Sequence, residues 1–179
     1  MYFLSVLFLF LPAGLANLVP PFAAIYLPKY DQPMDFGKTF KGKRILGDHK
    51  TFRGLVTGML MAELLFLLQI YLFDTQPFFK SLSLINYDST SIFFGLALGF
   101  GALAGDAIKS FVKRQINIVP GASWFPWDQI DWVIGSLLIS QFFISINLQT
   151  AGTYLLLGLV LHLIIKFIGF LIKMNKTVI

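Results

Sequence analysis

The chain has 179 residues, of which 56% are hydrophobic and only 13% are charged. Soluble domains carry about 25% charged residues, so this composition excludes an ordinary soluble enzyme, a disordered chain and a coiled coil, and it predicts an integral membrane protein. The sequence has no cysteine, which excludes disulfides, thiolate metal sites and cysteine nucleophiles. The formal net charge is +5. In a membrane protein the positions of the charged residues, more than their sum, indicate the orientation of the chain.

Five segments are long and apolar enough to cross a bilayer, whose hydrocarbon core of about 30 Å requires roughly 20 helical residues. They are Tyr2–Leu27, Gly54–Phe73, Ser91–Phe111, Trp127–Asn147 and Ala151–Ile172. The predicted fold class is therefore all-α: an integral membrane bundle of five transmembrane helices. Residues 1–179 are expected to form a single membrane-embedded domain.

Basic residues concentrate in alternate connections between these segments. Six Lys and Arg lie in Asp31–Arg53, two follow the third segment, and Lys173 and Lys176 lie in the C-terminal tail. The connections on the opposite side contain only Lys80. By the positive-inside rule, the basic loops and the C-terminus face the cytoplasm and the N-terminus lies outside. We therefore expect a multi-pass protein of the cell membrane.

The first segment contains Pro12, Asn17, Pro20 and Pro21 within its apolar run. Proline removes a backbone donor and clashes with the preceding turn, so the helix is expected to be interrupted. Two alternatives follow, a simple kink or a segment that lines a wet cavity.

The basic loop after the first segment contains a near repeat, Lys38-Thr-Phe-Lys-Gly42 and Lys50-Thr-Phe-Arg-Gly54. Lys and Arg donate charge-assisted hydrogen bonds to phosphate, and glycine lets a backbone approach a ligand closely. The simpler alternative is a topogenic loop that contacts anionic lipid headgroups. Asp48 favours a binding site, because a purely topogenic loop has no need of an acid beside its cations.

The third segment ends with Asp106, Lys109, Ser110 and Lys113 on one helical face, at positions i, i+3, i+4 and i+7. An acid this close to the membrane faces protein, water or a cation. The alternative is a local pair between Asp106 and Lys109, which contributes only a few tenths of a kcal/mol.

The fourth segment begins with Asp128 and Asp131, whose i, i+3 spacing lets the two carboxylates converge. Carboxylates suit Mg²⁺, which usually keeps waters and phosphate oxygens as its other ligands. The alternative is that both acids only complement the helix dipole. Together with Asp106 on the same side of the membrane, the pair favours a metal site.

The basic loop, the three acids and the interrupted first segment together suit the transfer of a nucleotidyl group to a lipid phosphate. Two anionic substrates meet only if cations hold them. The phosphate nucleophile is already ionised at pH 7, so positioning and electrostatics suffice without a general base. The alternative from another class is a small transporter that uses the interrupted first segment, Glu63 and Asp106 as its path. The crowding of polar groups at the cytoplasmic side favours the enzyme.

Four blocks occur in order along the chain: Ala16-Asn-x-x-Pro20, Asp48-His-Lys-Thr-x-Arg-Gly54, Gly105-Asp-x-x-Lys-Ser-x-x-Lys-Arg114 and Pro126-Trp-Asp-Gln-x-Asp131. In these blocks the chain resembles the CDP-archaeol synthase family, the archaeal-type CTP:lipid-phosphate cytidylyltransferases. The last two blocks are also similar to the phosphatidate cytidylyltransferase pattern, except that Gln129 stands where that wider pattern has Arg.

The resemblance implies Mg²⁺-dependent transfer of CMP from CTP to 2,3-di-O-geranylgeranylglyceryl phosphate, which gives CDP-archaeol and pyrophosphate in phospholipid biosynthesis. Phosphatidate is an alternative acceptor, because its reacting phosphomonoester is the same. The expected partners are CTP, the lipid phosphate and membrane lipids, with no nucleic acid, and the sequence leaves the oligomeric state open. The resemblance implies Asp106, Asp128 and Asp131 as metal ligands. It implies Lys50, Arg53, Lys113 and Arg114 as catalytic cations, and Asn17, Lys38, Lys43, Asp48 and Ser110 as substrate-binding residues.

Overall fold

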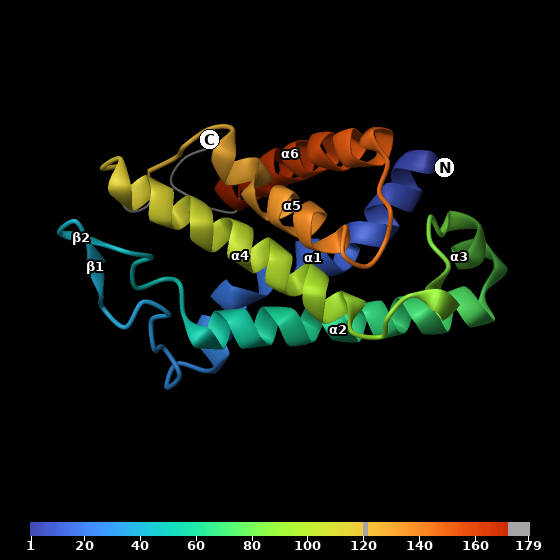
Figure 1. Cartoon of the computed structure of the whole chain (residues 1–179), viewed down its shortest axis with the longest axis horizontal. Coiled ribbons are helices and arrows are strands. Elements are labelled where there is room, and N and C mark those ends of the chain that lie inside the picture. Colours follow the sequence, from blue (N-terminus) through green and yellow to red (C-terminus); the bar gives the residue numbers. More distant parts are fainter. Residues whose placement is uncertain (120–121, 172–179) are drawn as a thin grey trace.

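The computed structural model describes residues 1–119 and 122–171 (Figure 1). Lys173 and Lys176 therefore lie outside the described residues. The helices are α1 (Tyr2–Tyr26), α2 (Phe52–Thr75), α3 (Pro77–Leu82), α4 (Phe94–Gln115), α5 (Trp127–Ser140) and α6 (Leu148–Leu171). A two-stranded hairpin, β1 (Thr39–Phe40) and β2 (Lys43–Arg44), lies in the first basic loop, and a 3₁₀ turn, η1 (Tyr87–Ser89), precedes α4.

Four of the described helices, α1, α2, α4 and α6, are long and apolar enough to cross a membrane. This confirms the predicted all-α membrane bundle. The predicted number of five spans is not confirmed, because α5 has only 14 residues. At 1.5 Å per residue its length is about 21 Å, which is shorter than a hydrocarbon core of about 30 Å.

The predicted fourth span, Trp127–Asn147, ends as a helix at Ser140. The Ser140 hydroxyl donates to a carbonyl three residues back, a local bond that competes with helical hydrogen bonding. The chain then turns, and the Asn147 side chain accepts an amide hydrogen bond in the first turn of α6. Hydropathy does not detect this end, because Phe142 and Phe143 keep the segment apolar.

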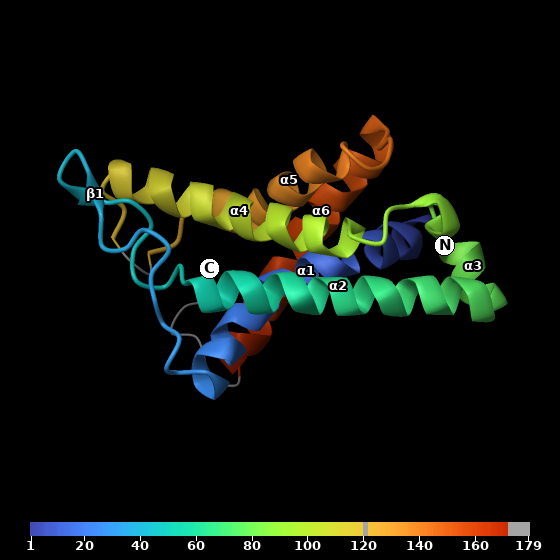
Figure 2. The ribbon, with the colours of Figure 1, turned by 60° about the horizontal axis from the view of Figure 1, so that its bottom comes forward.

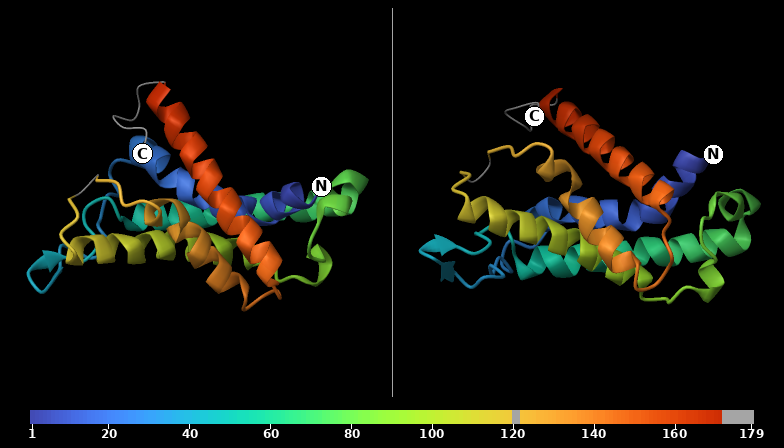
Figure 3. Two further views of the ribbon diagram at one scale, coloured as in Figure 1. Left: turned by 90° about the horizontal axis from the view of Figure 1, so that it is seen from above. Right: turned by 45° about the horizontal axis from the view of Figure 1, so that its top comes forward.

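The long helices and α5 run in alternating directions along the molecule (Figures 1 and 2). The β1–β2 hairpin, the start of α2 and the end of α4 lie at one end, whereas the N-terminus and α3 lie at the other. α6 leans away from the remaining helices (Figure 3), and only 11% of its most apolar window is buried. The end that carries the hairpin is therefore also the end where the predicted site residues of α2, α4 and α5 gather.

α1 continues as one helix through Pro12, Pro20 and Pro21. The predicted interruption is therefore not an unwound segment. Asn17, Pro20 and Pro21 instead line a cavity, so of the two alternatives the structure supports the cavity lining. Nearer the N-terminus, Phe10 stacks on Tyr154 of α6 with ring centres 3.8 Å apart, which fixes α1 in the core.

Glycines bring α4 and α5 into backbone contact. A Cβ atom at Gly105 would lie 2.2 Å from the Asp131 carbonyl oxygen, and one at Gly135 would lie 2.0 Å from the Gly101 carbonyl oxygen. Small residues of this kind let membrane helices approach closely. As a result Asp106, which follows Gly105, is held against the first turns of α5.

Glu63 of α2 binds the beginning of α4. Its Oε2 atom accepts a 2.8 Å hydrogen bond from the Leu96 amide, one of the first-turn amides that have no partner within the helix. A carboxylate at this position also complements the helix dipole. Glu63 is thus engaged as a cap between two helices, and this removes one element of the transporter alternative.

Gly135→Ala is expected to separate α4 from α5, because the added methyl group would overlap the Gly101 backbone. Overpacking of this kind costs about 1–3 kcal/mol, so the thermal unfolding midpoint in detergent should fall. Gly152→Ala is the matched control, since no atom outside its own helix lies within 4 Å of its position. Equal midpoints for the two variants would contradict the proposed role of the glycine contact.

Candidate functional site

The two copies of the near repeat fold differently. In the first copy, Lys41 and Gly42 both have positive φ angles, 50° and 77°, and form the two-residue turn between β1 and β2. In the second copy, Thr51 is the N-cap of α2 and its Oγ1 atom accepts from the Gly54 amide at 3.2 Å. The repeat therefore forms a hairpin and a helix start, not two equivalent phosphate loops.

Asp35 holds the hairpin loop together, although the sequence pattern did not identify it as a functional residue. Its side chain is fully buried. The carboxylate accepts from the Arg44 guanidinium at 2.8 and 3.2 Å, and from the amides of Gly37 at 3.1 Å, Leu46 at 2.9 Å and Gly47 at 3.0 Å. The sequence offered one indication of this role: Asp35 precedes Gly37 by two residues, which is the spacing of an Asx turn.

Burial alone would raise the pKa of the Asp35 carboxyl, but the Arg44 guanidinium and three backbone amides outweigh burial and hold that pKa well below its usual range. The same pair raises the pKa of Arg44. Because the unfolded-state pKa of Asp is about 3.9, Asp35 stabilises the loop at every pH above that value. This contribution is lost only in strong acid, as the pH falls through the folded-state pKa.

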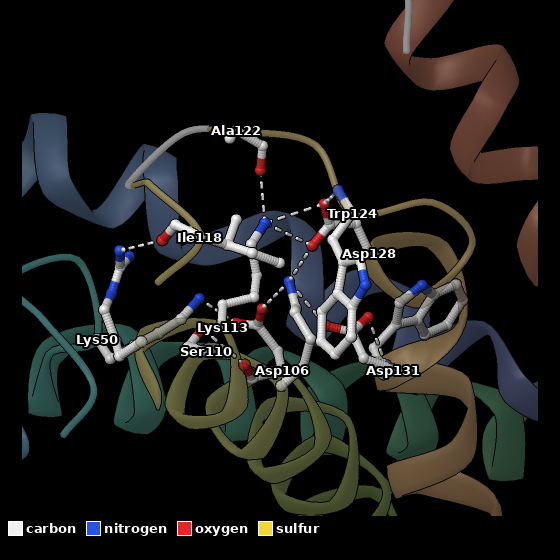
Figure 4. A network of polar contacts seen from close by, with 12 residues as sticks. Lys50, Asp106, Ser110, Lys113, Ile118, Ala122, Trp124, Asp128 and Asp131 are labelled. Carbon is white, nitrogen blue, oxygen red and sulfur yellow. Dashed lines mark hydrogen bonds and ion pairs between the residues drawn. The ribbon is translucent and has the colours of Figure 1, made fainter. Parts of the chain in front are cut away.

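The three predicted acids, Asp106, Asp128 and Asp131, lie in one network of polar contacts (Figure 4). Lys109 lies among them: its Nζ atom is 3.2 Å from Asp106 Oδ1, 3.0 Å from Asp128 Oδ1 and 3.0 Å from Asp131 Oδ2. The local Asp106–Lys109 pair therefore exists, but it is one part of a cluster that also joins α4 to α5. The structure brings together all three predicted metal ligands.

Two further lysines complete this cluster. Lys50 makes an ion pair with Asp106. Lys113 Nζ donates to both Asp128 oxygens at 3.1 Å and to the Ala122 carbonyl at 2.6 Å. In the described part of the chain, three carboxylates are thus matched by three ammonium groups, as a partly buried network of charges requires.

The acids fit a hard divalent cation in their chemistry. Carboxylate oxygens are the ligands that Mg²⁺ prefers. Asp131 is more than nine-tenths buried, and its Oδ2 atom faces the cluster, 3.0 Å from Lys109 Nζ. The spacing is nevertheless that of an ammonium complex: the three oxygens lie 3.0–3.2 Å from Lys109 Nζ, whereas Mg²⁺ requires about 2.0–2.1 Å. Accordingly, among the described residues no three acidic or histidine side chains are close enough to chelate a metal as they stand.

Two polar cavities flank Lys50. The first, which we call the α1 cavity, has a volume of about 760 Å³, and its walls include Asn17, Asp31, Arg53 and Asp106. The second, the α4 cavity, has a volume of about 510 Å³. The cations in its lining are Arg44, Lys50, Lys109, Lys113 and Arg114. Both cavities share Asp48, His49 and Lys50, so Lys50 stands where they meet.

The remaining predicted cations lie at different places. Arg114 lines the α4 cavity and donates to the Ile118 carbonyl at 3.4 Å. Arg53 lines the α1 cavity and donates to the Leu27 carbonyl at 2.8 Å. Lys38 and Lys43 line neither cavity. Lys43 instead donates to the Gln115 carbonyl at 2.5 Å, which fixes the hairpin to the end of α4.

The predicted polar residues also divide. Ser110 lines the α4 cavity, but its hydroxyl donates to the Asp106 carbonyl at 2.8 Å within the helix. Asp48 is exposed and pairs with Arg44 at 2.8 Å. His49 lies between the two cavities without having been predicted. The sequence indication for His49 was its position inside the Asp48–Gly54 block.

The CarS-like family of CDP-archaeol synthases matches residues 1–179 of this chain. The chain belongs to this family. The CDP-archaeol synthase of Methanosarcina acetivorans is 39% identical over 178 residues, which cover 93% of this chain and 98% of the relative. That of Methanosphaerula palustris is 40% identical over 174 residues, with the same coverage. That of Methanopyrus kandleri is 33% identical over 176 residues, covering 96% and 90%.

A solved structure described as an intramembrane enzyme for archaeal membrane lipid biosynthesis has a TM-score of 0.71 to this one. The two are 29% identical, and the match covers 90% of this chain and 92% of the other. The resemblance seen in the sequence is thus confirmed at the level of the family. Together with the four apolar helices, these comparisons make the chain a multi-pass membrane protein.

Asp35→Asn is expected to loosen the hairpin loop, because an amide cannot accept the same set of charge-assisted hydrogen bonds. The thermal unfolding midpoint should fall, since Arg44 is no longer held beside the α4 cavity. Asp88→Asn, at an exposed position in η1, is the control. An Asp35→Asn protein with an unchanged midpoint would show that the carboxylate does not organise the loop.

Proposed function

We propose that this protein is a CDP-archaeol synthase. A non-bridging oxygen of the lipid phosphomonoester attacks the α-phosphorus of CTP, and the bond from that phosphorus to the bridging β-oxygen breaks. CDP-lipid and pyrophosphate are the products, and 2,3-di-O-geranylgeranylglyceryl phosphate is the acceptor. The observation that carries the proposal is the meeting of two polar cavities at Lys50, which pairs with Asp106 of the three-carboxylate cluster, in a chain of this family.

The charge of the two cavities supports one assignment of the substrates. Among the described residues, the lining of the α4 cavity has five cations and a single acid, Asp48, and this excess suits the triphosphate, the more highly charged anion. The α1 cavity has Lys50 and Arg53 as its cations. A more apolar cavity of about 470 Å³ adjoins it at Arg53 and continues between Tyr30 and Val56. The lipid phosphate therefore belongs beside Arg53, with its hydrocarbon directed to the apolar cavity.

Asp106, Asp128 and Asp131 are the residues that would hold Mg²⁺. When bound, the ion would neutralise phosphate oxygens and stabilise the charge that develops on the leaving pyrophosphate. The protein's own contribution is positional. Lys50, at the boundary of the cavities, orients both anions, and the preorganised cations of the α4 cavity stabilise the transferring nucleotidyl group and the leaving pyrophosphate.

The proposed orientation follows from charge and from helix direction. The basic loops carry the site, so this end faces the cytoplasm by the positive-inside rule. α1, α2, α4, α5 and α6 alternate in direction (Figures 1 and 2), which supports five passes if the turn after α5 completes the fourth. The N-terminus then lies outside, in a single-domain enzyme of the cell membrane.

The activity is tested with purified protein in detergent or lipid, supplied with Mg²⁺, labelled CTP and one acceptor at a time. We expect labelled CDP-lipid with geranylgeranylglyceryl phosphate, a much lower rate with phosphatidate, and loss of turnover in EDTA. ATP, GTP and UTP are the nucleotide controls. A faster reaction with phosphatidate would change the proposed acceptor, and no product from folded protein with either lipid would refute the function.

The assignment of the cavities predicts a separation of kinetic effects. Arg114→Ala should raise the KM for CTP about tenfold or more, because a hydrogen bond to a charged group contributes about 1.5–3 kcal/mol. Arg53→Ala should raise the KM for the lipid by a similar factor. Each variant should leave the other KM near the wild-type value, and Lys80→Ala, at the opposite end, should change neither. Reversed effects would exchange the two substrates between the cavities.

A further inference from the structure

The Lys109 ammonium lies among the three carboxylates that would hold Mg²⁺. It contacts one oxygen from each of Asp106, Asp128 and Asp131 at nearly equal distances, 3.0–3.2 Å. We propose that Lys109 is a built-in counter-ion that occupies the divalent-cation position of the metal-free enzyme and leaves it when substrate binds. This inference rests on the proposed function, because it takes Mg²⁺ as the ion that these acids receive.

The ammonium and the metal cannot share this position. Three oxygens at 3.0–3.2 Å would have to move inward by about 1 Å to meet the Mg²⁺–oxygen distance. A divalent ion among them would then press directly against the ammonium, and like charges in close contact repel strongly in a site of low dielectric. Metal binding therefore requires the Lys109 side chain to move.

The α4 cavity offers the displaced ammonium a second position. Lys109 lines this cavity together with Lys113 and Arg114, and we have placed the triphosphate there. A phosphate oxygen is a charge-assisted partner for the ammonium, so the substrate compensates Lys109 for the carboxylates that it gives up. The exchange couples the two ligands: the nucleotide removes the cation that competes with the metal, and so raises the affinity for the metal.

The same ammonium has a structural effect when no metal is bound. It lies on α4 and bridges Asp106 of its own helix to Asp128 and Asp131 of α5. Without it, partly buried carboxylates would face one another with too few cations, which is strongly destabilising. Lys109 thus keeps the α4–α5 site assembled between catalytic cycles.

The test measures metal binding in the absence of nucleotide and lipid. Mn²⁺ is the probe, followed by the spectroscopic signal of the free ion, and Mg²⁺ is added as competitor. Lys109→Met should bind Mn²⁺ at least tenfold more tightly than the wild type, because no ammonium has to be displaced. Lys109→Arg, which keeps the charge, should remain as weak as the wild type, and so should Lys80→Met, a charge-loss control at the far end of the molecule.

Thermal unfolding gives an independent measurement on the same variants. In EDTA, Lys109→Met should unfold at a lower temperature than the wild type, and Mg²⁺ alone should restore its midpoint by a larger shift than it gives the wild type. Mn²⁺ affinity that is equal to or weaker than the wild-type value would overturn the inference, as would a midpoint that does not respond to Mg²⁺. Failure of the proposed function has a different signature, the absence of Mg²⁺-dependent CDP-lipid formation by the wild type.

Discussion

The close contact between α4 and α5 is the constraint on which the site depends. Gly101, Gly105 and Gly135 bring the two backbones together at distances that no larger residue permits. The register of this contact places Asp106 beside Asp128 and Asp131. Three acids from two helices can converge on one ammonium only because no side chains separate those helices.

The balance of charge in the site is set before any substrate arrives. Three lysines from two separate parts of the chain match the three acids, so the cluster is stable inside a membrane protein without a metal. Among the other cations of the site, Arg53 and Arg114 donate to backbone carbonyls, and Arg44 donates to Asp35. Apart from Lys109, these cations are therefore already positioned for anionic substrates, and binding does not have to order their long side chains.

The sequence predicted the parts of this site that depend on residue type and spacing. Helical periodicity placed Asp106 and Lys113 on one face, and the i, i+3 spacing placed Asp128 beside Asp131. The sequence could not reveal that Lys109 occupies the centre of the acids, because that depends on the distance between two helices.

Two further features could not be predicted from the sequence, because they also depend on tertiary structure. Asp35 is buried only after the hairpin folds over it, so its local Asx spacing alone gives little indication of its role. The length of α5 is set by the turn after Ser140, inside a segment whose hydropathy never falls. Hydrophobic patterning predicts the presence of a helix more reliably than its end.

The helix ends explain why so many charges are tolerated at this level of the membrane. The last turn of α4 carries Lys113 and Arg114, and the first turns of α5 carry Asp128 and Asp131. Cations complement the negative end of a helix dipole, and acids complement the positive end. Because the two helices run in opposite directions, each set of charges is stabilised by its own helix and by the set that faces it. Dipole complementation and a ligand site, which were alternatives for these acids in the sequence, are therefore compatible roles of the same residues: the dipoles lower the cost of assembling charges that the substrates and the metal then use.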